Sequence, residues 1–141
     1  MSRHGRARRR PPPFLLDTHI WFWYLTGSER LPKSLVGAID AASGEVWLSP
    51  VSVWELGLLV DRGRIRLAGG PRGWTEEAQR RFPVRDATLN REVAVVSLEI
   101  NFPHRDPADR FLAASALVYG LTLVTIDDRL TKATWLPTRS G

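Results

Sequence analysis

The sequence predicts an α/β fold, a three-layer α/β/α domain built on a central, mainly parallel sheet. Short apolar runs at Phe14–Leu16, Val46–Leu48 and Leu121–Ile126 have the length and composition of buried strands. Segments with helical patterning separate these runs, and strands that alternate with helices form parallel sheets covered on both faces. With 141 residues, of which 43% are hydrophobic, the chain can bury one core of ordinary size.

The predicted helices begin after a capping residue or a proline and end near a glycine or a proline. They cover Ile20–Leu25, Ser34–Ala42, Val51–Val60, Trp74–Arg81, Leu89–Val96 and the segment from Pro107 to Gly120. Thr18 is expected to cap the first helix, and Pro83–Asp86 is expected to be a short extended piece.

The positive charge of the chain is concentrated at its start. Five arginines among the first thirteen residues account for the whole net charge of +5, which leaves 15 basic and 15 acidic side chains in the remainder. Pro11–Pro13 is stiff and cannot enter a sheet interior, so we expect a basic, flexible tail at residues 1–13 and a single domain at 14–141. The tail can attract phosphate, or it can be a plain disordered leader.

The composition also excludes several kinds of site. The chain has no cysteine, which rules out disulfides, thiolate zinc sites and cysteine nucleophiles, and which suits a reducing cytoplasm, where we expect the protein. No apolar run approaches the roughly 20 residues that a membrane-spanning helix needs. Asp17 interrupts the apolar stretch after the basic start, which argues against a secretory signal.

Four carboxylates are expected to meet at one edge of the sheet. Asp17 and Asp127 directly follow apolar strands, where the carboxyl ends of parallel strands form the usual ligand site. Glu55 lies near the start of the helix after the second strand, and Asp109 lies in the first turn of the helix before the last strand. The topology therefore makes all four side chains candidates for a single site.

Such a cluster favours metal chemistry. Carboxylates close together repel one another and raise each other's pKa values unless a positive charge compensates. Mg²⁺ prefers oxygen ligands, and Mn²⁺ accepts the same set. Bound metal polarises a phosphate oxygen and lowers the pKa of a bound water, so phosphodiester hydrolysis is the natural reaction for this site.

Each acid also has a purely structural interpretation. Asp17 can cap the first helix, and Asp109 can interact with a helix dipole. Asp106 precedes a proline, which is the usual pattern of a helix cap, and we favour that role for it. Asp127 can be a turn residue. Glu55 is the hardest to explain in this way, because a charged side chain among apolar neighbours needs a partner.

Five further side chains are candidates for supporting or substrate-binding roles. They are Thr18, Ser52, Arg110, Thr125 and Asp128. The guanidinium of Arg110 matches phosphate oxygens, although a salt bridge to Asp106 or Asp109 is an equal alternative. The hydroxyls of Ser52 and Thr125 can bind metal-bound waters, or can cap helices and pack in the core.

Three segments resemble the PIN-domain family, and within it the VapC-type toxins of bacterial toxin–antitoxin pairs. The segments are LLDTHIWFW at Leu15–Trp23, LSPVSVWELGLLVDRGRI at Leu48–Ile65 and HRDPADRFLAASALVYGLTLVTIDDRL at His104–Leu130. They occur in the family's order and near its spacing. The resemblance covers most of Leu15–Leu130, and Ala68–Asn101 is its least diagnostic part.

The resemblance implies a role for each acid. Asp17, Glu55, Asp109 and Asp127 correspond to the four metal-binding and catalytic acids of the family, in chain order. Asp128 follows Asp127 directly, so the choice between these two stays open. By the same likeness, Trp135–Leu136 is expected to be the remnant of the family's last short strand.

The family's activity implies a magnesium- or manganese-dependent endoribonuclease with a PIN-like fold that cleaves cellular RNA. It also implies a homodimer and a small antitoxin that blocks the active-site groove. The consecutive aromatic side chains of Trp21–Tyr24 cannot all face one core, so a second copy or an antitoxin helix is expected to cover part of them.

The main alternative function is a catalytically silent PIN-like module that binds RNA or protein. A phosphatase with Asp17 as nucleophile is weaker, because His19 stands where such enzymes usually carry a second aspartate.

Overall fold

The computed structural model describes residues 12–102 and 106–141, and in them a five-stranded sheet. The strands are β1 (Phe14–Leu16), β2 (Val46–Leu48), β3 (Arg85–Asp86), β4 (Thr122–Val124) and β5 (Thr138–Arg139). Their order across the sheet is β3-β2-β1-β4-β5, and every neighbouring pair is parallel. The predicted parallel sheet is confirmed.

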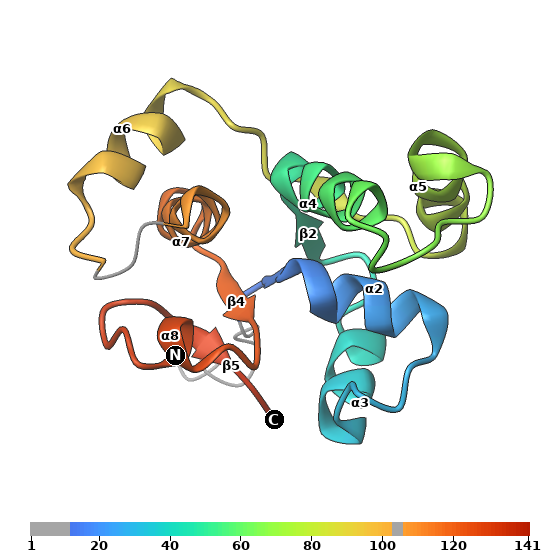
Figure 1. Ribbon diagram of the computed structural model, residues 1–141. Coiled ribbons are helices and arrows are strands. Elements are labelled where there is room, and N and C mark those ends of the chain that lie inside the picture. The colour runs from blue at the N-terminus through green and yellow to red at the C-terminus, as the bar shows by residue number, and fades with distance from the viewer. Residues whose placement is uncertain (1–11, 103–105) are drawn as a thin grey trace.

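Seven helices connect these strands in the described residues (Figure 1). They are α2 (Thr18–Thr26), α3 (Lys33–Ala41), α4 (Pro50–Asp61), α5 (Gly70–Arg81), α6 (Arg91–Glu99), α7 (Pro107–Tyr119) and the short α8 (Asp128–Thr131). None of these helices is both long and apolar enough to cross a membrane.

The central strand β1 divides its side chains between two cores. Phe14 and Leu16 belong to a cluster that includes side chains of α2, α3 and α5, whereas Leu15 packs with α7 on the opposite face. This division follows from the two-residue repeat of a strand, in which successive side chains point to opposite faces. Helices therefore cover both faces, which gives the three layers expected from the sequence.

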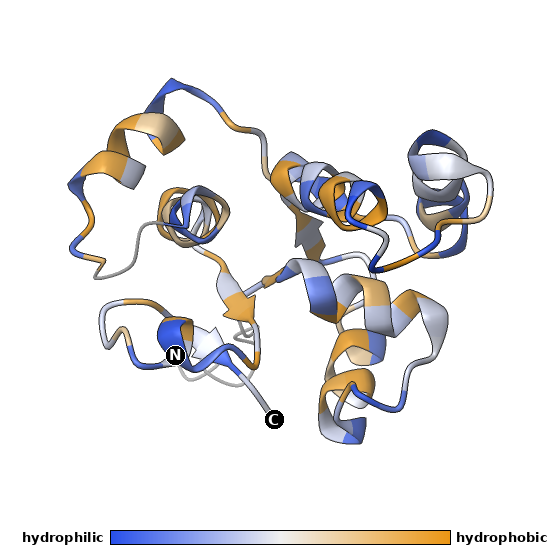
Figure 2. Cartoon of the chain, viewed as in Figure 1, coloured by the Kyte–Doolittle hydropathy of each residue, from blue (hydrophilic) through white to orange (hydrophobic). Residues whose placement is uncertain are grey.

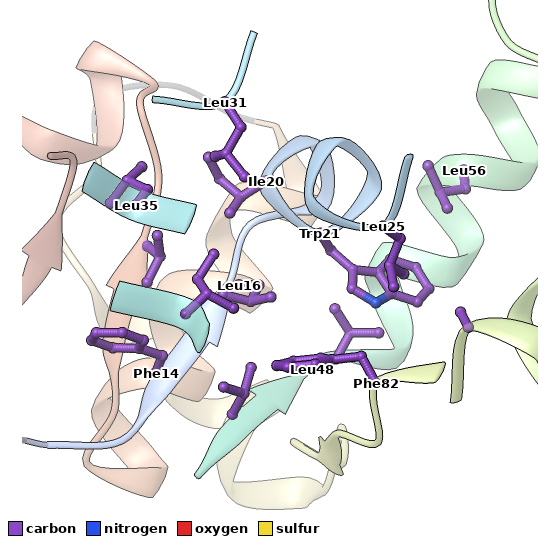
Figure 3. Packing of buried hydrophobic residues seen from close by; sticks show 14 of the residues in the cluster. Phe14, Leu16, Ile20, Trp21, Leu25, Leu31, Leu35, Leu48, Leu56 and Phe82 are labelled. Carbon is purple, nitrogen blue, oxygen red and sulfur yellow. The ribbon is translucent and has the colours of Figure 1, made fainter. Parts of the chain in front are cut away.

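The first core is centred on a buried tryptophan. Trp21 of α2 is only 2% exposed, and Figure 3 shows its side chain near that of Leu25, in the cluster that also holds Leu56 and Phe82. Part of the aromatic surface after it is also covered within the chain, because Phe22 contacts Trp74 at a ring distance of 5.7 Å. Phe22, Trp23 and Tyr24 remain partly exposed, so the cover of this segment by a second copy or an antitoxin helix stays a prediction.

The second core depends on α7, whose inner side carries Leu112, Ala113 and Ala116, all essentially inaccessible to solvent. Small side chains let this helix lie close to the sheet. Asp106 caps it by accepting a hydrogen bond from the Ala108 amide at 3.0 Å, which confirms the predicted capping role. Figure 2 shows the contrast between layers, with β4 strongly hydrophobic and the outer helix α5 largely hydrophilic.

Several predicted boundaries shift. Asp17, rather than Thr18, caps α2, and Thr18 is the first residue of that helix. Helix α5 begins at Gly70, earlier than predicted, α6 lies slightly later than predicted, and α8 was not predicted. Strand β4 is shorter than the apolar run that predicted it, because that run also serves as loop. Of the predicted basic tail, only Pro12 and Pro13 lie within the described residues.

The last strand is also displaced from its expected position. Trp135–Leu136 is not a strand; instead the backbone pairs with β4 after Pro137, through bonds such as Thr125 N to Arg139 O at 3.0 Å. The apolar side chain of Leu136 packs in the second core, although its backbone is not part of a strand. The edge strand itself is short and polar, so hydrophobicity did not reveal it.

The two cores predict a large difference between two leucines on neighbouring helices. Leu112 of α7 is fully buried, whereas Leu98 of α6 is 81% exposed. We expect Leu112→Ala to lower the free energy of unfolding by about 2–5 kcal/mol, because it removes buried apolar contacts and leaves a cavity. Leu98→Ala is expected to change it by less than about 0.5 kcal/mol. Urea denaturation followed by circular dichroism measures both, and equal effects would contradict this description of the core.

Candidate active site

The candidate site lies where the sheet changes its direction of winding. The chain passes from β1 outward to β2 and β3, and later returns to place β4 on the other side of β1. In open parallel sheets this switch point leaves a crevice at the carboxyl ends of the two central strands. Asp17 follows β1 and Thr125 follows β4, so both enter this crevice.

Asp17 follows β1 and forms hydrogen bonds both to the start of α2 and to the residue that follows β4. Its Oδ1 accepts a hydrogen bond from the Thr18 amide at 2.8 Å, and its Oδ2 accepts one from the Thr125 hydroxyl at 2.7 Å. Burial raises the pKa of Asp17, and the negative charge of Asp127 adds to the rise, while these two hydrogen bonds and the nearby His19 oppose it. Asp17 therefore acts as a helix cap and as a member of the acidic cluster, which makes its two interpretations compatible.

Glu55 enters the crevice from α4. Ser49 caps this helix and Pro50 occupies its first turn, which fixes where α4 begins relative to β2. The Thr18 hydroxyl donates to the Glu55 carboxylate and also lies 2.9 Å from the Ser52 hydroxyl. Burial raises the pKa of Glu55; the Thr18 hydrogen bond lowers it, and the charges of Asp17 and Asp106 raise it further.

Asp109 is the most deeply buried of the four acids. It lies in the first turn of α7 and is 6% exposed. Its pKa is raised to about 7, chiefly by burial and then by the charges of Asp106, Asp17 and Asp127, with Arg129 opposing. Asp106 was favoured as a helix cap over a role in metal binding, and its electrostatic action on Asp109 and Glu55 was not predicted.

Arg129 is a cationic residue of the site that the sequence analysis did not identify. Its Nη2 lies 3.0 Å from Asp127 Oδ2 and 3.4 Å from Asp109 Oδ2, so one guanidinium connects two acids from distant parts of the chain. Asp127 also caps α8 by accepting from the Arg129 amide at 2.9 Å. The spacing of two residues between Asp127 and Arg129, at the start of a helix, is the signal that could have identified the pair.

Asp127 and Asp128 occupy different environments. Asp127 is half-buried and acts electrostatically on Asp17 and Asp109, whereas Asp128 is exposed at the first position of α8. The geometry therefore favours Asp127 over Asp128 as the fourth member of the cluster.

Arg110 makes contacts that the sequence did not predict. Its guanidinium donates to the carbonyl oxygens of Ser97 at 3.0 Å, Ile100 at 3.2 Å and Phe102 at 3.4 Å. A guanidinium is well suited to the carbonyls at the end of a helix such as α6. Arg110 therefore links the end of α6 to α7, and its role in substrate binding stays a prediction.

The donor set fits a hard divalent cation by its chemistry. The acids supply oxygen ligands, and their pKa values are raised chiefly by burial and further by the charges of neighbouring acids, a cost that a bound cation would relieve. Within residues 12–102 and 106–141, no three acidic or histidine side chains are placed closely enough to hold a metal ion between them. Binding would therefore require the side chains to turn toward one another from their present hydrogen bonds.

Known proteins share this sequence pattern. The chain matches the family described as PIN domain over residues 14–136. It is also 34% identical to Ribonuclease VapC22 of Mycobacterium tuberculosis over 116 residues, which cover 82% of this chain and 88% of that protein.

Solved structures share the fold. VapBC2 from Rickettsia felis, bound to a DNA fragment from its promoter, has a TM-score of 0.65 at 15% identity, over 89% of this chain and 96% of that chain. DNA-bound VapBC from Salmonella typhimurium gives 0.66 at 16%, over 92% and 98%. FitAcB from Neisseria gonorrhoeae gives 0.64 at 21%, over 90% and 96%. At these identities the likeness shows the fold.

The raised pKa of Asp109 predicts a pH-dependent stability in the metal-free protein. An unfolded aspartate ionises near pH 4, whereas folded Asp109 keeps its proton up to about pH 7. The folded state therefore binds more protons in this window, and the free energy of unfolding should fall as the pH rises from about 4 to 7.

Asp109→Asn should reduce this fall and stabilise the protein above pH 7 by about 1–3 kcal/mol, since it removes the cost of ionising a buried acid. Urea denaturation in EDTA at several pH values measures the effect, with exposed Asp86→Asn as the control. An unchanged pH profile in Asp109→Asn would show that another group governs it.

Proposed function

Because this chain belongs to the PIN domain family, we propose that it is a metal-dependent endoribonuclease, the toxin of a type II toxin–antitoxin pair. The observation that supports the chemistry most is the convergence of Asp17, Glu55, Asp109 and Asp127 on the switch point of the sheet. The relative at 34% identity is named a ribonuclease, which supports RNA as the substrate.

In this proposal the four acids hold Mg²⁺ or Mn²⁺, which when bound lowers the pKa of a water and polarises the phosphate. In the metal-free protein Thr125 holds Asp17 and Thr18 holds Glu55 at the crevice, and both carboxylates would turn from these hydrogen bonds to bind the cation. Ser52 supports Thr18 from α4. Such hydrogen-bonded neighbours fix the position of ligands and typically change metal affinity by about 10–100-fold.

Arg129 has a charge-balancing role in the same proposal. It pairs with Asp109 and Asp127 and partly offsets the repulsion that would otherwise act on them in the metal-free protein. The same pairing is the observation that favours the alternative, a catalytically silent module that binds RNA or protein. Metal binding distinguishes the two, because a silent module would keep the Arg129 pairs and take up no cation.

We also propose an antitoxin partner and a cytoplasmic location, as RNA cleavage must be held in check where RNA is present. The solved structures of similar fold from Rickettsia felis and Salmonella typhimurium are VapBC assemblies, which supports a protein partner of this kind. The folded part of the chain is formally neutral, so recognition of RNA must depend on local groups rather than overall charge.

The nuclease proposal is tested by cleavage of labelled RNA by the purified protein. We expect cleavage with Mg²⁺ or Mn²⁺, none with EDTA, and a loss of at least about 100-fold in Asp17→Asn and Glu55→Gln, since each removes a charged ligand. Both substitutions preserve side-chain shape, and asparagine still caps a helix. Glu92→Gln, on the exposed surface of α6, is the matched control. Full activity in both site variants would refute the assigned site.

A homodimer is proposed through an apolar depression of about 280 Å³ between α4 and α7. Trp54 is 54% exposed and Leu89 is 39% exposed at this depression. Exposed apolar side chains gathered in one patch are typical of an interaction surface. Phe111 lines its α7 side.

We expect Trp54→Ala to weaken the dimer by at least about 30-fold, because exposed tryptophans dominate such interfaces. Sedimentation equilibrium measures the change, and Leu98→Ala, at an exposed leucine of α6, is the control. A parent protein that stays monomeric at high concentration would contradict the dimer.

A further inference from the structure

A second feature of the crevice is a cavity that continues from the acids. It has a volume of about 690 Å³, which is within the range of pockets that hold small organic ligands. Asp17 and Asp127 line it together with residues of α2, of the segment after α2, and of the end of α4 and the segment after it. The cavity therefore adjoins the proposed reaction centre.

The rest of the lining combines aromatic and cationic groups. Trp23 is half-buried, and the guanidinium carbon of Arg30 lies 5.1 Å from the centre of its ring. The imidazole of His19 lies 5.6 Å from the same ring at an angle of 47°. Arg64, after the end of α4, adds a second exposed guanidinium to the lining. Planar aromatic and guanidinium groups are the surfaces on which nucleic acid bases stack.

The lining of the cavity favours a nucleotide over an apolar or acidic ligand. Its acids would repel an acidic peptide, whereas in the proposed function they would hold a metal ion and thus a phosphate. An RNA strand whose phosphate lies at Asp17 and Asp127 must place its next nucleotide in or beside this cavity. Arg64 is suited to the adjacent backbone phosphate, because guanidinium binds phosphate oxygens directly.

We propose that this cavity is a subsite for one unpaired nucleotide next to the scissile phosphate, an inference that rests on the proposed function. The base stacks on the Trp23–Arg30 platform, and Arg64 contacts the flanking backbone. A base within a duplex keeps both faces covered by its neighbours, so it presents no face to this platform. The protein therefore selects single-stranded RNA at this position by shape and stacking.

The test measures binding rather than turnover. A fluorescein-labelled, 12-nucleotide single-stranded RNA and its duplex are titrated with the protein in Mg²⁺, in a Glu55→Gln background that slows cleavage, and anisotropy reports binding. We expect the single strand to bind at least about 10-fold more tightly than the duplex. Trp23→Leu and Arg30→Gln should each weaken single-strand binding by about 10-fold, because stacking on one aromatic group contributes at this scale.

Matched controls keep the result interpretable. Trp23→Phe retains an aromatic face and should bind within about 3-fold of the parent, which separates stacking from any loss of packing. Arg72→Gln, at an exposed arginine of α5 outside the cavity, should leave binding unchanged. Arg64→Gln should reduce the slope of log affinity against log salt by about one, as expected for one lost phosphate contact. Thermal melts confirm that each variant folds.

Three outcomes would overturn the subsite. The first is equal binding of single strand and duplex, and the second is unchanged binding in folded Trp23→Leu and Arg30→Gln. The third is that these variants bind RNA normally but no longer bind a co-expressed antitoxin, which would make the cavity a protein-binding groove. Failure of the proposed function is distinguishable, because the parent would then bind the single strand through Trp23 yet cleave no RNA with Mg²⁺ or Mn²⁺.

Discussion

The burial of several carboxylates at one edge of the sheet is the constraint on which this structure depends. The fold brings acids from four separate segments to this edge, and burial, reinforced by their mutual repulsion, raises the pKa values of Asp17, Glu55 and Asp109. Two threonine hydroxyls, a short helix and one guanidinium limit the cost of that arrangement. A divalent cation bound among these acids would offset the same cost.

The fold supplies the positions, and the local capping interactions supply the orientations. Because β1 and β4 are neighbours, the residues that follow them meet in one crevice. Asp17 is directed into the crevice by its hydrogen bonds to α2 and Thr125, and Glu55 is directed there by Thr18. Helix caps that stabilise the fold are thus also the groups that determine where charge accumulates. Trp23 lines the same cavity as Asp17 and Asp127, so the proposed chemistry and the proposed selection of substrate would lie on adjoining surfaces.

Much of this arrangement could be predicted from the sequence, because it depends on local patterns. Apolar runs of strand length gave the central strands, and an acid after such a run must lie at the carboxyl end of the sheet. Features set by long-range contacts could not be predicted. Arg110 contacts the end of α6 only in the folded chain, and Arg129 pairs with Asp109, which lies 20 residues earlier in the sequence. The edge strand β5 escaped prediction because pairing of its backbone, not its side chains, defines it.

The double role of Asp17 and Asp127 has an evolutionary consequence. Each aspartate caps a helix while contributing charge to the crevice, and asparagine caps helices about as well as aspartate does. A single-base codon change from aspartate to asparagine can therefore silence the chemistry while the fold survives. Domains of this architecture have a short path from enzyme to inert binding scaffold, and a shared shape among them is poor evidence of shared activity.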